Sequence, residues 1–438
     1  MKTFYLETFG CQMNVHDSEK VAGVLAARGY TQVDCPEQAD LILYNTCSIR
    51  EKAEQKVYSR LQQFRRHSDG KLVAVLGCVA QQEGERIFER APQVALVCGS
   101  ACYWRLPELL ERLEGGERRL AALEQNTDET FEPRLARRQS PYRAYLTIIE
   151  GCDKQCTFCV VPFTRGRERS RSSQNILREA RALVAAGYTE IQLLGQNVSS
   201  YRDPSPAGWD FPTLLAEVAA IPGLKRLRFT TSHPKDFDRR IVTCIEENPV
   251  LANHVHLPVQ SGSDRVLQRM RRQYTREQYL EKVAWIKGAR RAIAISTDII
   301  VGFPGETEED FQQTLSLLDE VGYDAVFSFK YSARPHTAAL KLDGHLPEQE
   351  KGRRLAILQE RQRAIQLRRN GEWIGRTVEV LVESFNSATG QWVGRTSENR
   401  VVNFHAPGEQ SSSLAGRYVQ VHISRAGPNS LAGELAGL

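Results

Sequence analysis

The sequence predicts an α/β protein in three parts: an amino-terminal parallel sheet covered by helices, a central partial (β/α)6 barrel and a small all-β barrel at the carboxy end. From Lys2 to about Glu114, short apolar runs alternate with amphipathic stretches, and the same rhythm resumes at Tyr142. After Gly375 the pattern changes to a period of two, with turn residues between the runs. Strands that alternate with helices favour parallel sheets, whereas period-two runs favour barrels or sandwiches.

Length and composition agree with this organisation. A chain of 438 residues is long enough for two or three domains. Hydrophobic residues at 41% and charged residues at 25% exclude a disordered chain. Neither a signal segment nor a run of about 18 apolar residues occurs, so we expect no membrane span and a cytoplasmic location. The formal charge of +5 is mild, although arginine is clustered locally.

The first part, residues 1–116, contains four apolar runs that end in short turns. They read KTFYLETFG, DLILYNTC, KLVAVLGC and VALVCG. The stretch 117–140 is polar, contains several arginines and shows no sustained apolar period, so we interpret it as a linker.

The second part, 141–373, contains six further runs, each followed by a plausible helix. They read YLTIIEGC, EIQLLGQN, LKRLRFTTSHP, HVHLPVQSG, IAISTDIIVGFPGE and DAVFSFKYSARP. Six strand–helix units fall two short of a full eight-unit barrel. An arginine-rich helix from about Pro347 to Trp373 follows, and 375–438 forms the all-β part.

The strongest chemical signal is GCDKQCTFCVVP, which lies in the loop after the first barrel strand, at the end of a barrel where sites form. Its thiols are spaced Cys-x3-Cys-x2-Cys: Cys152, Cys156 and Cys159. Three thiolates on a four-iron cluster leave one iron open for a cofactor or substrate. Zinc is the alternative, but structural zinc prefers four ligands in paired spacing, and no fourth Cys or His follows nearby.

A second set of cysteines follows three strands of the first part: Cys11, Cys47 and Cys78. In a parallel sheet these strand ends meet at one edge, so the three thiols can converge on a second cluster. A single cysteine there would be an ordinary buried residue. Cys98 follows the fourth strand, with Cys102 close behind, and is the rival ligand.

The first motif, with Phe158 before its last cysteine, resembles the signature of the radical-SAM superfamily. Nearly the whole chain resembles the methylthiotransferase family, in its domain order and in TFGCQMN, NTCSIREKAEQKV, VLGCVAQ, LLGQNV, TTSHP, LPVQSGSD and DIIVGFPGET. The last part resembles a TRAM domain, an RNA-binding β-barrel. Ser48-Ile49-Arg50 is similar to the subgroup that acts on tRNA.

This resemblance implies two [4Fe–4S] clusters and two molecules of S-adenosylmethionine per turnover. The cluster on the Cys152 set would generate a 5′-deoxyadenosyl radical, and the cluster on the Cys11 set would present the sulfur. For the S-adenosylmethionine pocket we predict Phe158 and polar groups at the barrel strand ends, although a strand-end group can also merely cap a helix or turn. These groups are Gln196, Asn197, Ser232, Gln260, Gly302 and Glu306.

The implied reaction converts N6-isopentenyladenosine at position 37 of tRNA to its 2-methylthio derivative. An electron donor and a protein that supplies the cluster or its sulfur are expected partners, and we expect a monomer. Two alternatives stay open: methylthiolation of a ribosomal-protein aspartate, and an iron–sulfur RNA-binding module without catalysis.

Arginines form three groups that could meet RNA phosphates. The groups are Arg165, Arg167, Arg169 and Arg171; Arg269, Arg271 and Arg272; and the helix from Arg353 to Arg369. A charge run is more often a solvated helix face, and we favour that interpretation for the long helix.

Overall fold

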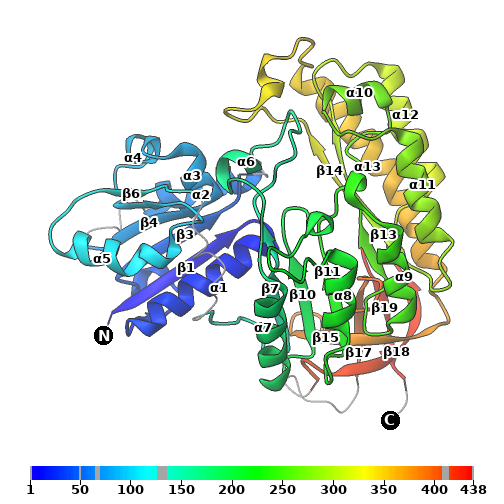
Figure 1. Cartoon of the computed structure of the whole chain (residues 1–438), viewed down its shortest axis with the longest axis horizontal. Coiled ribbons are helices and arrows are strands. Elements are labelled where there is room, and N and C mark those ends of the chain that lie inside the picture. The colour runs from blue at the N-terminus through cyan, green and yellow to red at the C-terminus, as the bar shows by residue number, and fades with distance from the viewer. Residues whose placement is uncertain (1, 49–50, 65–69, 126–135, 407–413, 437–438) are drawn as a thin grey trace.

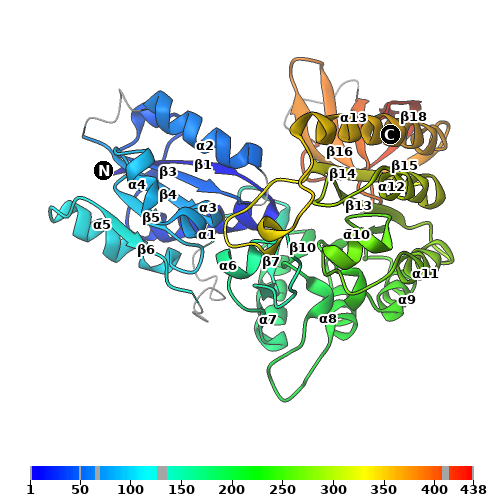
Figure 2. The same cartoon turned by 90° about the horizontal axis from the view of Figure 1, so that it is seen from above.

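The computed structural model describes residues 2–48, 51–64, 70–125, 136–406 and 414–436, without the side chains at 51–53. Within these ranges the chain forms the three predicted parts, and the amino-terminal sheet lies beside the barrel in two perpendicular views (Figures 1 and 2). In this described part, no helix is both long enough and apolar enough to cross a membrane.

The amino-terminal part is a six-stranded parallel sheet in the order β2-β1-β3-β4-β5-β6. Its strands are β1 Thr3–Phe9, β2 Thr31–Gln32, β3 Leu41–Thr46, β4 Leu72–Gly77, β5 Leu96–Cys98 and β6 Leu120–Ala122. One face packs against α1 Gln12–Ala27 and α5 Leu106–Glu114. The other face packs against α2 Glu51–Phe64 and α4 Arg86–Arg90, while the short α3, Cys78–Glu83, directly follows β4.

Strand β6 lies inside the stretch that the sequence predicted to be a linker, 117–140. It pairs in parallel with β5, and its side chains at Leu120 and Ala122 are buried. The sheet therefore continues beyond residue 116. A run of three residues is too short to show a hydrophobic period, which is why the sequence pattern missed it. Residues 126–135 of the predicted linker lie outside the described residues.

The central part has six parallel strands that follow one another in chain order, as predicted. They form two three-stranded sheets, β11-β10-β7 and β12-β13-β14, joined by a parallel bridge between Leu227 and Leu251. The strands are β7 Arg143–Thr147, β10 Glu190–Leu194, β11 Arg226–Phe229, β12 His254–His256, β13 Ala294–Val301 and β14 Ala325–Lys330. A short antiparallel pair, β8 Ile149–Glu150 and β9 Arg169–Ser170, flanks the cysteine loop.

Helices cover the outside of this barrel, and one apolar core fills the space between them and the strands. They are α7 Ser173–Ala185, α8 Phe211–Ala219, α9 Arg239–Glu247, α10 Asp264–Arg269, α11 Arg276–Lys287, α12 Glu308–Val321 and α13 Glu348–Gly371. The short helix α6, Val161–Thr164, lies instead against α3 of the amino-terminal part. Side-chain caps start several of them, because the first helical N–H groups lack partners. Thr307 and Asp310 form a capping box at the start of α12, which ends at Gly322 in the left-handed conformation.

The carboxy-terminal part is a closed five-stranded barrel in the order β15-β16-β17-β19-β18. Its strands are β15 Thr377–Asn386, β16 Gln391–Arg395, β17 Val401–His405, β18 Tyr418–Ala426 and β19 Leu431–Leu435. It packs against the amino ends of the central strands, where Arg226 donates to the carbonyl of Arg395 at 3.0 Å and Arg228 donates to that of Ser397 at 3.0 Å. The loop between β16 and β17 therefore covers the floor of the central barrel.

Candidate active site

The loop of the first cysteine set can adopt its shape only because residue 151 is glycine. Gly151 has a φ of +76°, and a Cβ there would lie 1.9 Å from the carbonyl oxygen of Arg167. Its backbone nitrogen donates a 2.7 Å hydrogen bond to Oε1 of Gln196. The loop presents three thiols to one cavity of about 230 Å³: Cys152, Cys156 and Cys159.

Five of the predicted cofactor residues line this smaller cavity: Phe158, Gln196, Asn197, Ser232 and Gln260. Gly302 and Glu306 are not in its wall. The carboxylate of Glu306 accepts from the backbone of Gly302 at 2.9 Å and from Arg354 at 2.7 Å. These two residues thus hold the loop after β13 in place around a buried ion pair, so the prediction that they contact the cofactor is not supported by their position.

The cavity wall also contains His233 and Asp298, which the sequence pattern did not single out, and Arg272, which the sequence pattern assigned to RNA. Asn197 accepts from the backbone of His233 at 2.9 Å, so it shapes the wall as well as lining it. The hydroxyl of Ser232 is buried and has no protein partner in the described ranges, which leaves it available to a ligand. Ser48 lines the cavity too, whereas Ile49 and Arg50 lie outside the described residues.

Burial raises the pKa of two thiols of the first cysteine set. The pKa of Cys152 rises to about 11 and that of Cys159 to about 12, so these two unligated thiols are neutral near pH 7. Arg272 donates from Nη1 to Sγ of Cys156 at 3.4 Å. Iron displaces the thiol protons on binding, and a buried guanidinium offsets part of the resulting negative charge. This donor set therefore fits an iron–sulfur cluster.

The second cysteine set lies at the carboxyl ends of three neighbouring strands, β1, β3 and β4. The backbone of Cys47 donates to the carbonyl of Phe9 at 2.9 Å, which brings it beside Cys11. A Cβ on Gly10 would lie 2.8 Å from the Cβ of Cys47, so the approach requires glycine. Cys11 caps α1 and Cys78 begins α3. Helix amino termini favour thiolates, the form that binds iron.

The pKa of Cys11 is lowered to about 6, mainly because Cys47 hydrogen-bonds to its sulfur. Cys78 accepts a 3.3 Å hydrogen bond from Nε of Arg165. Among the residues that the structure describes, no three Cys, His, Asp or Glu side chains are grouped closely enough to hold one metal ion.

Cys98, the rival ligand, lies in a different environment. Its side chain is fully buried in the apolar core between the sheet and helices α1 and α5. Burial raises its pKa well above the ordinary value. Cys102 donates to the carboxylate of Glu124 at 3.1 Å. The surroundings of Cys98 and Cys102 are therefore those of cysteines with a structural role, and they differ from those of the proposed cluster ligands.

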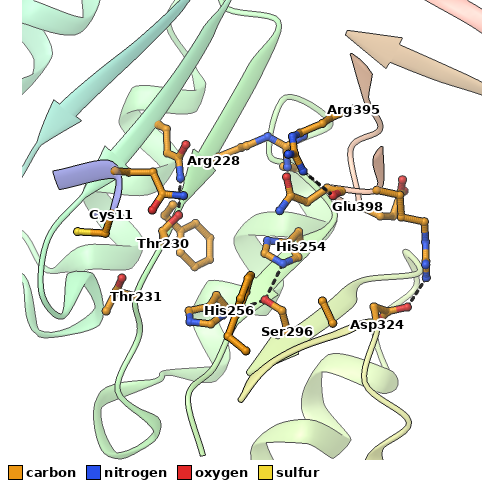
Figure 3. A pocket seen from close by; sticks show the side chains of 18 of the residues that line it. Cys11, Arg228, Thr230, Thr231, His254, His256, Ser296, Asp324, Arg395 and Glu398 are labelled. Atoms are coloured by element: carbon orange, nitrogen blue, oxygen red, sulfur yellow. Dashed lines mark hydrogen bonds and ion pairs between the residues drawn. The ribbon is translucent and has the colours of Figure 1, made fainter. Parts of the chain in front are cut away.

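A larger cavity of about 660 Å³, which we call the chamber, lies within the central barrel. Cys11 and Cys47 line it from the amino-terminal part, and Glu398 lines it from the carboxy-terminal barrel. In Figure 3, Cys11 lies on one side of the chamber and Arg395 and Glu398 lie on another, with histidines between them. The chamber and the smaller cavity share five wall residues: Val161, Gln196, Thr231, Asp298 and Phe329.

A chain of hydrogen bonds crosses the middle of the chamber (Figure 3). The hydroxyl of Ser296 lies 2.8 Å from Nε2 of His254 and 2.9 Å from Nδ1 of His256, and Nε2 of His256 lies 3.5 Å from the carboxylate of Asp298. A hydroxyl has one proton, so Ser296 donates to at most one of the two imidazoles, and at least one imidazole donates its N–H to Ser296. The polar residues alternate along the two strands, in HVH at 254–256 and in STD at 296–298. This alternation could have indicated that their side chains face the inside of the barrel.

The shared wall also contains a backbone outlier. Thr231 has a φ of +73°, which is rare for a β-branched residue, and Gln260 in the smaller cavity has the same value. Such conformations persist where the surrounding structure requires them, often at functional sites.

The arginine groups divide between interior and surface. Arg165, Arg171 and Arg272 are buried, so the prediction that these three meet RNA phosphates is wrong. Arg167, whose side chain is 84% exposed, and Arg271 remain on the surface. Along α13 the arginines mostly pair with nearby acids, as Arg353 does with Glu350 at 2.8 Å.

Three family models match successive parts of the chain: uncharacterized protein family UPF0004 at residues 3–99, the radical SAM superfamily at 146–318 and the TRAM domain at 371–436. A Solibacter usitatus protein named tRNA-2-methylthio-N(6)-dimethylallyladenosine synthase is 63% identical over 438 residues, covering 100% of this chain and 98% of the relative. A Koribacter versatilis protein of the same name is 58% identical, with coverages of 100% and 98%. The chain belongs to this synthase family.

Solved structures agree with the fold of this synthase family member. The radical S-adenosylmethionine methyltransferase TsrM from Kitasatospora setae matches with a TM-score of 0.56 at 16% identity, over 77% of this chain and 75% of TsrM. The cobalamin-dependent S-adenosylmethionine radical enzyme OxsB matches with a TM-score of 0.52 at 14% identity, over 80% of this chain and 56% of OxsB. At these identities the likeness shows a shared fold.

Proposed function

We propose that this chain is a tRNA-modifying enzyme that adds a methylthio group to C2 of N6-isopentenyladenosine at position 37. The observation that carries the proposal is the shared wall between the two cavities. Thiols of one set line the smaller cavity and thiols of the other set line the chamber. An aromatic C2–H bond has no acidic proton for a base to remove, so a radical source and a sulfur source must both reach the same carbon.

When bound, a [4Fe–4S] cluster with S-adenosylmethionine on the Cys152 set supplies a 5′-deoxyadenosyl radical, and a second cluster on the Cys11 set supplies the sulfur. Cys152, Cys156 and Cys159 would hold the first cluster, and Cys11, Cys47 and Cys78 the second. Ser232 and Gln260 in the cavity wall present polar groups to S-adenosylmethionine. Two molecules are consumed per turnover, one for each role.

The residues of the chamber suit a modified adenine. Ser296, His256 and Asp298 offer hydrogen-bonding groups to the polar edge of the base. Phe229 and Phe327 in the same wall offer apolar surface to the isopentenyl group. Walls from all three parts of the chain exclude water around the base, which protects a radical from side reactions.

The carboxy-terminal barrel would hold the tRNA. Three arginines on it are exposed: Arg376, Arg417 and Arg425. Phosphate contacts of this kind release counterions, so binding should weaken as salt rises. Further partners are an electron donor and a protein that supplies the second cluster or its sulfur. We propose that the enzyme acts as a monomer in the cytoplasm, where its tRNA substrate resides.

A variant with Cys11, Cys47 and Cys78 all changed to Ala tests the division of labour. It should still cleave S-adenosylmethionine to 5′-deoxyadenosine when reduced, because the first cluster stays, but it should form no methylthio product. The matched variant with Cys152, Cys156 and Cys159 changed to Ala should lose cleavage as well. Methylthio product from the first variant would mean that the sulfur comes from elsewhere.

Nucleoside analysis of tRNA from a deletion strain tests the substrate. Loss of the 2-methylthio nucleoside is the expected result. An unchanged tRNA together with a mass change in a ribosomal protein would favour the aspartate alternative, which the names of the relatives do not favour.

A further inference from the structure

Arg165 connects the two cysteine sets. It follows α6, in the segment directly after Cys159, yet its side chain reaches into the amino-terminal part. There its Nε donates to Sγ of Cys78 at 3.3 Å, and its Nη2 donates to the carboxylate of Asp17. In the sequence, Arg165 therefore lies next to the first cysteine set, but its guanidinium contacts a cysteine of the second set.

Both residues that Arg165 contacts are on helices that begin at a cysteine of the second set. Asp17 is on α1, which Cys11 caps, and Cys78 is the first residue of α3. The side chains of Arg165 and Asp17 are 4% and 2% exposed. A buried cation is costly unless its donors are satisfied. The positive charge therefore lies inside the protein, directly against one of the proposed ligands.

One donor of Arg165 is left over. Its Nη1 is buried and has no partner within the described residues. Arg272, the arginine beside the first set, differs in this respect: Nη1 reaches Cys156, Nε donates to Tyr274 at 3.0 Å, and Nη2 donates to the carbonyl of Pro258 at 3.0 Å. Buried N–H groups without acceptors are uncommon in folded proteins, and a sulfur of a cluster beside Cys78 is an acceptor of the required kind.

We propose that Arg165 is a positioning residue for the second iron–sulfur cluster, which it holds through hydrogen bonds to sulfur and whose reduction potential it raises. The inference rests on the proposed second cluster. Reduction adds negative charge to a cluster, so a nearby cation and N–H donors to sulfur stabilise the reduced form. Asp17 opposes this effect because its carboxylate compensates the same guanidinium.

Two substitutions at this ion pair should move the potential in opposite directions. The test uses the full chain, reconstituted anaerobically with Cys152, Cys156 and Cys159 changed to Ala, so that only the second cluster reports. A redox titration followed by electron paramagnetic resonance gives its midpoint potential. Arg165→Gln should shift the potential to more negative values, and Asp17→Asn should shift it to more positive values. Arg167→Gln, on the exposed part of the same loop, is the matched control and should leave it unchanged.

A purely structural role for the pair predicts a different pattern, in which both variants lose cluster or shift together. Shifts of the same sign, or shifts no larger than that of Arg167→Gln, would overturn the inference. If Arg165→Gln does not fold around a cluster, Asp17→Asn decides alone: a positive shift supports the inference, and a null or negative shift overturns it. A parent protein without any cluster would instead overturn the proposed function, and the inference with it.

Discussion

The hydroxyl of Ser296 lies 2.9 Å from Nδ1 of His256, on the strand beside it, and the same hydroxyl lies 2.8 Å from His254. Two imidazoles on one strand thus share one hydroxyl on the next. Because the hydroxyl has one proton, at least one of the two imidazoles must donate its N–H to Ser296. The shared contact therefore restricts which ring nitrogens of these histidines carry hydrogen.

Replacing Ser296 with Ala should destabilise the protein. The change removes the shared partner of two imidazole nitrogens, which lie in a largely buried site, and an unsatisfied buried polar group costs about 1–3 kcal/mol. Urea unfolding should show this loss of unfolding free energy. Ser316→Ala, on the exposed face of α12, is the control and should change it by less than about 0.5 kcal/mol. Equal stabilities for the two variants would contradict the hydrogen-bonded arrangement.

Stability should also fall in mild acid because of His254. Burial, and next Arg228, lowers the pKa of this residue well below its ordinary value. In the unfolded chain the pKa is about 6.5, so below that pH the unfolded state binds a proton that the folded state does not. The contribution of His254 to stability is complete above about pH 6.5 and declines as the pH falls, by up to about 1.4 kcal/mol per pH unit.

Urea unfolding at about pH 7.5 and about pH 5.5 measures this dependence. His254→Asn should make it shallower, although not flat, because burial also lowers the pKa of His16 and His233. His405→Asn, on the exposed side of β17, should leave the dependence as it is. An unchanged slope in His254→Asn would show that the folded protein tolerates a charged imidazole in the chamber.

Cys78→Ala should lower the iron content of the protein, whereas Cys98→Ala should leave it unchanged. Cys78→Ala should lose the second cluster, about half of the iron in a protein with two four-iron clusters. Cys98→Ala should keep all the iron and lose roughly 1 kcal/mol of stability, because its thiol only fills space in the core. Iron analysis after anaerobic reconstitution distinguishes them. The reverse result would make Cys98 the third ligand.

Arg400 should anchor the carboxy-terminal barrel. It is buried, pairs with Asp324 and donates to the side chain of Asn370. Arg400→Ala should destabilise the protein by roughly 3–5 kcal/mol, the usual result of breaking a buried ion pair. The loss should not exceed this range, because Asp324 still has a second ion-pair partner, Arg369, at 3.2 Å.

The control is Arg425→Ala, an exposed arginine on β18, for which chemical unfolding should detect no comparable loss. A point substitution is more informative than removing the whole barrel. Removal would leave the buried side chains of Arg226 and Arg228 without the acceptors that Arg395 and Ser397 provide. A stability of Arg400→Ala equal to that of the control would mean that the barrel is held mainly by other contacts.

The sequence alone predicted the order of the three parts, the six barrel strands and the places of the proposed cluster ligands. These features depend on neighbours in the chain. Period-two and helical patterns are local, and a cysteine directly after a strand must lie at the carboxyl edge of a parallel sheet. Cys11, Cys47 and Cys78 could be grouped for this reason before any contact was known.

Tertiary structure decided what long-range packing controls. Arg165 looked like one of several surface arginines, but it contacts Cys78, 87 residues earlier in the chain. Glu306 looked like a cofactor residue, yet it pairs with Arg354 from α13. Local pattern cannot show which charge becomes buried, because burial depends on which distant element packs over it. The same reason hid the chamber, whose walls come from all three parts of the chain.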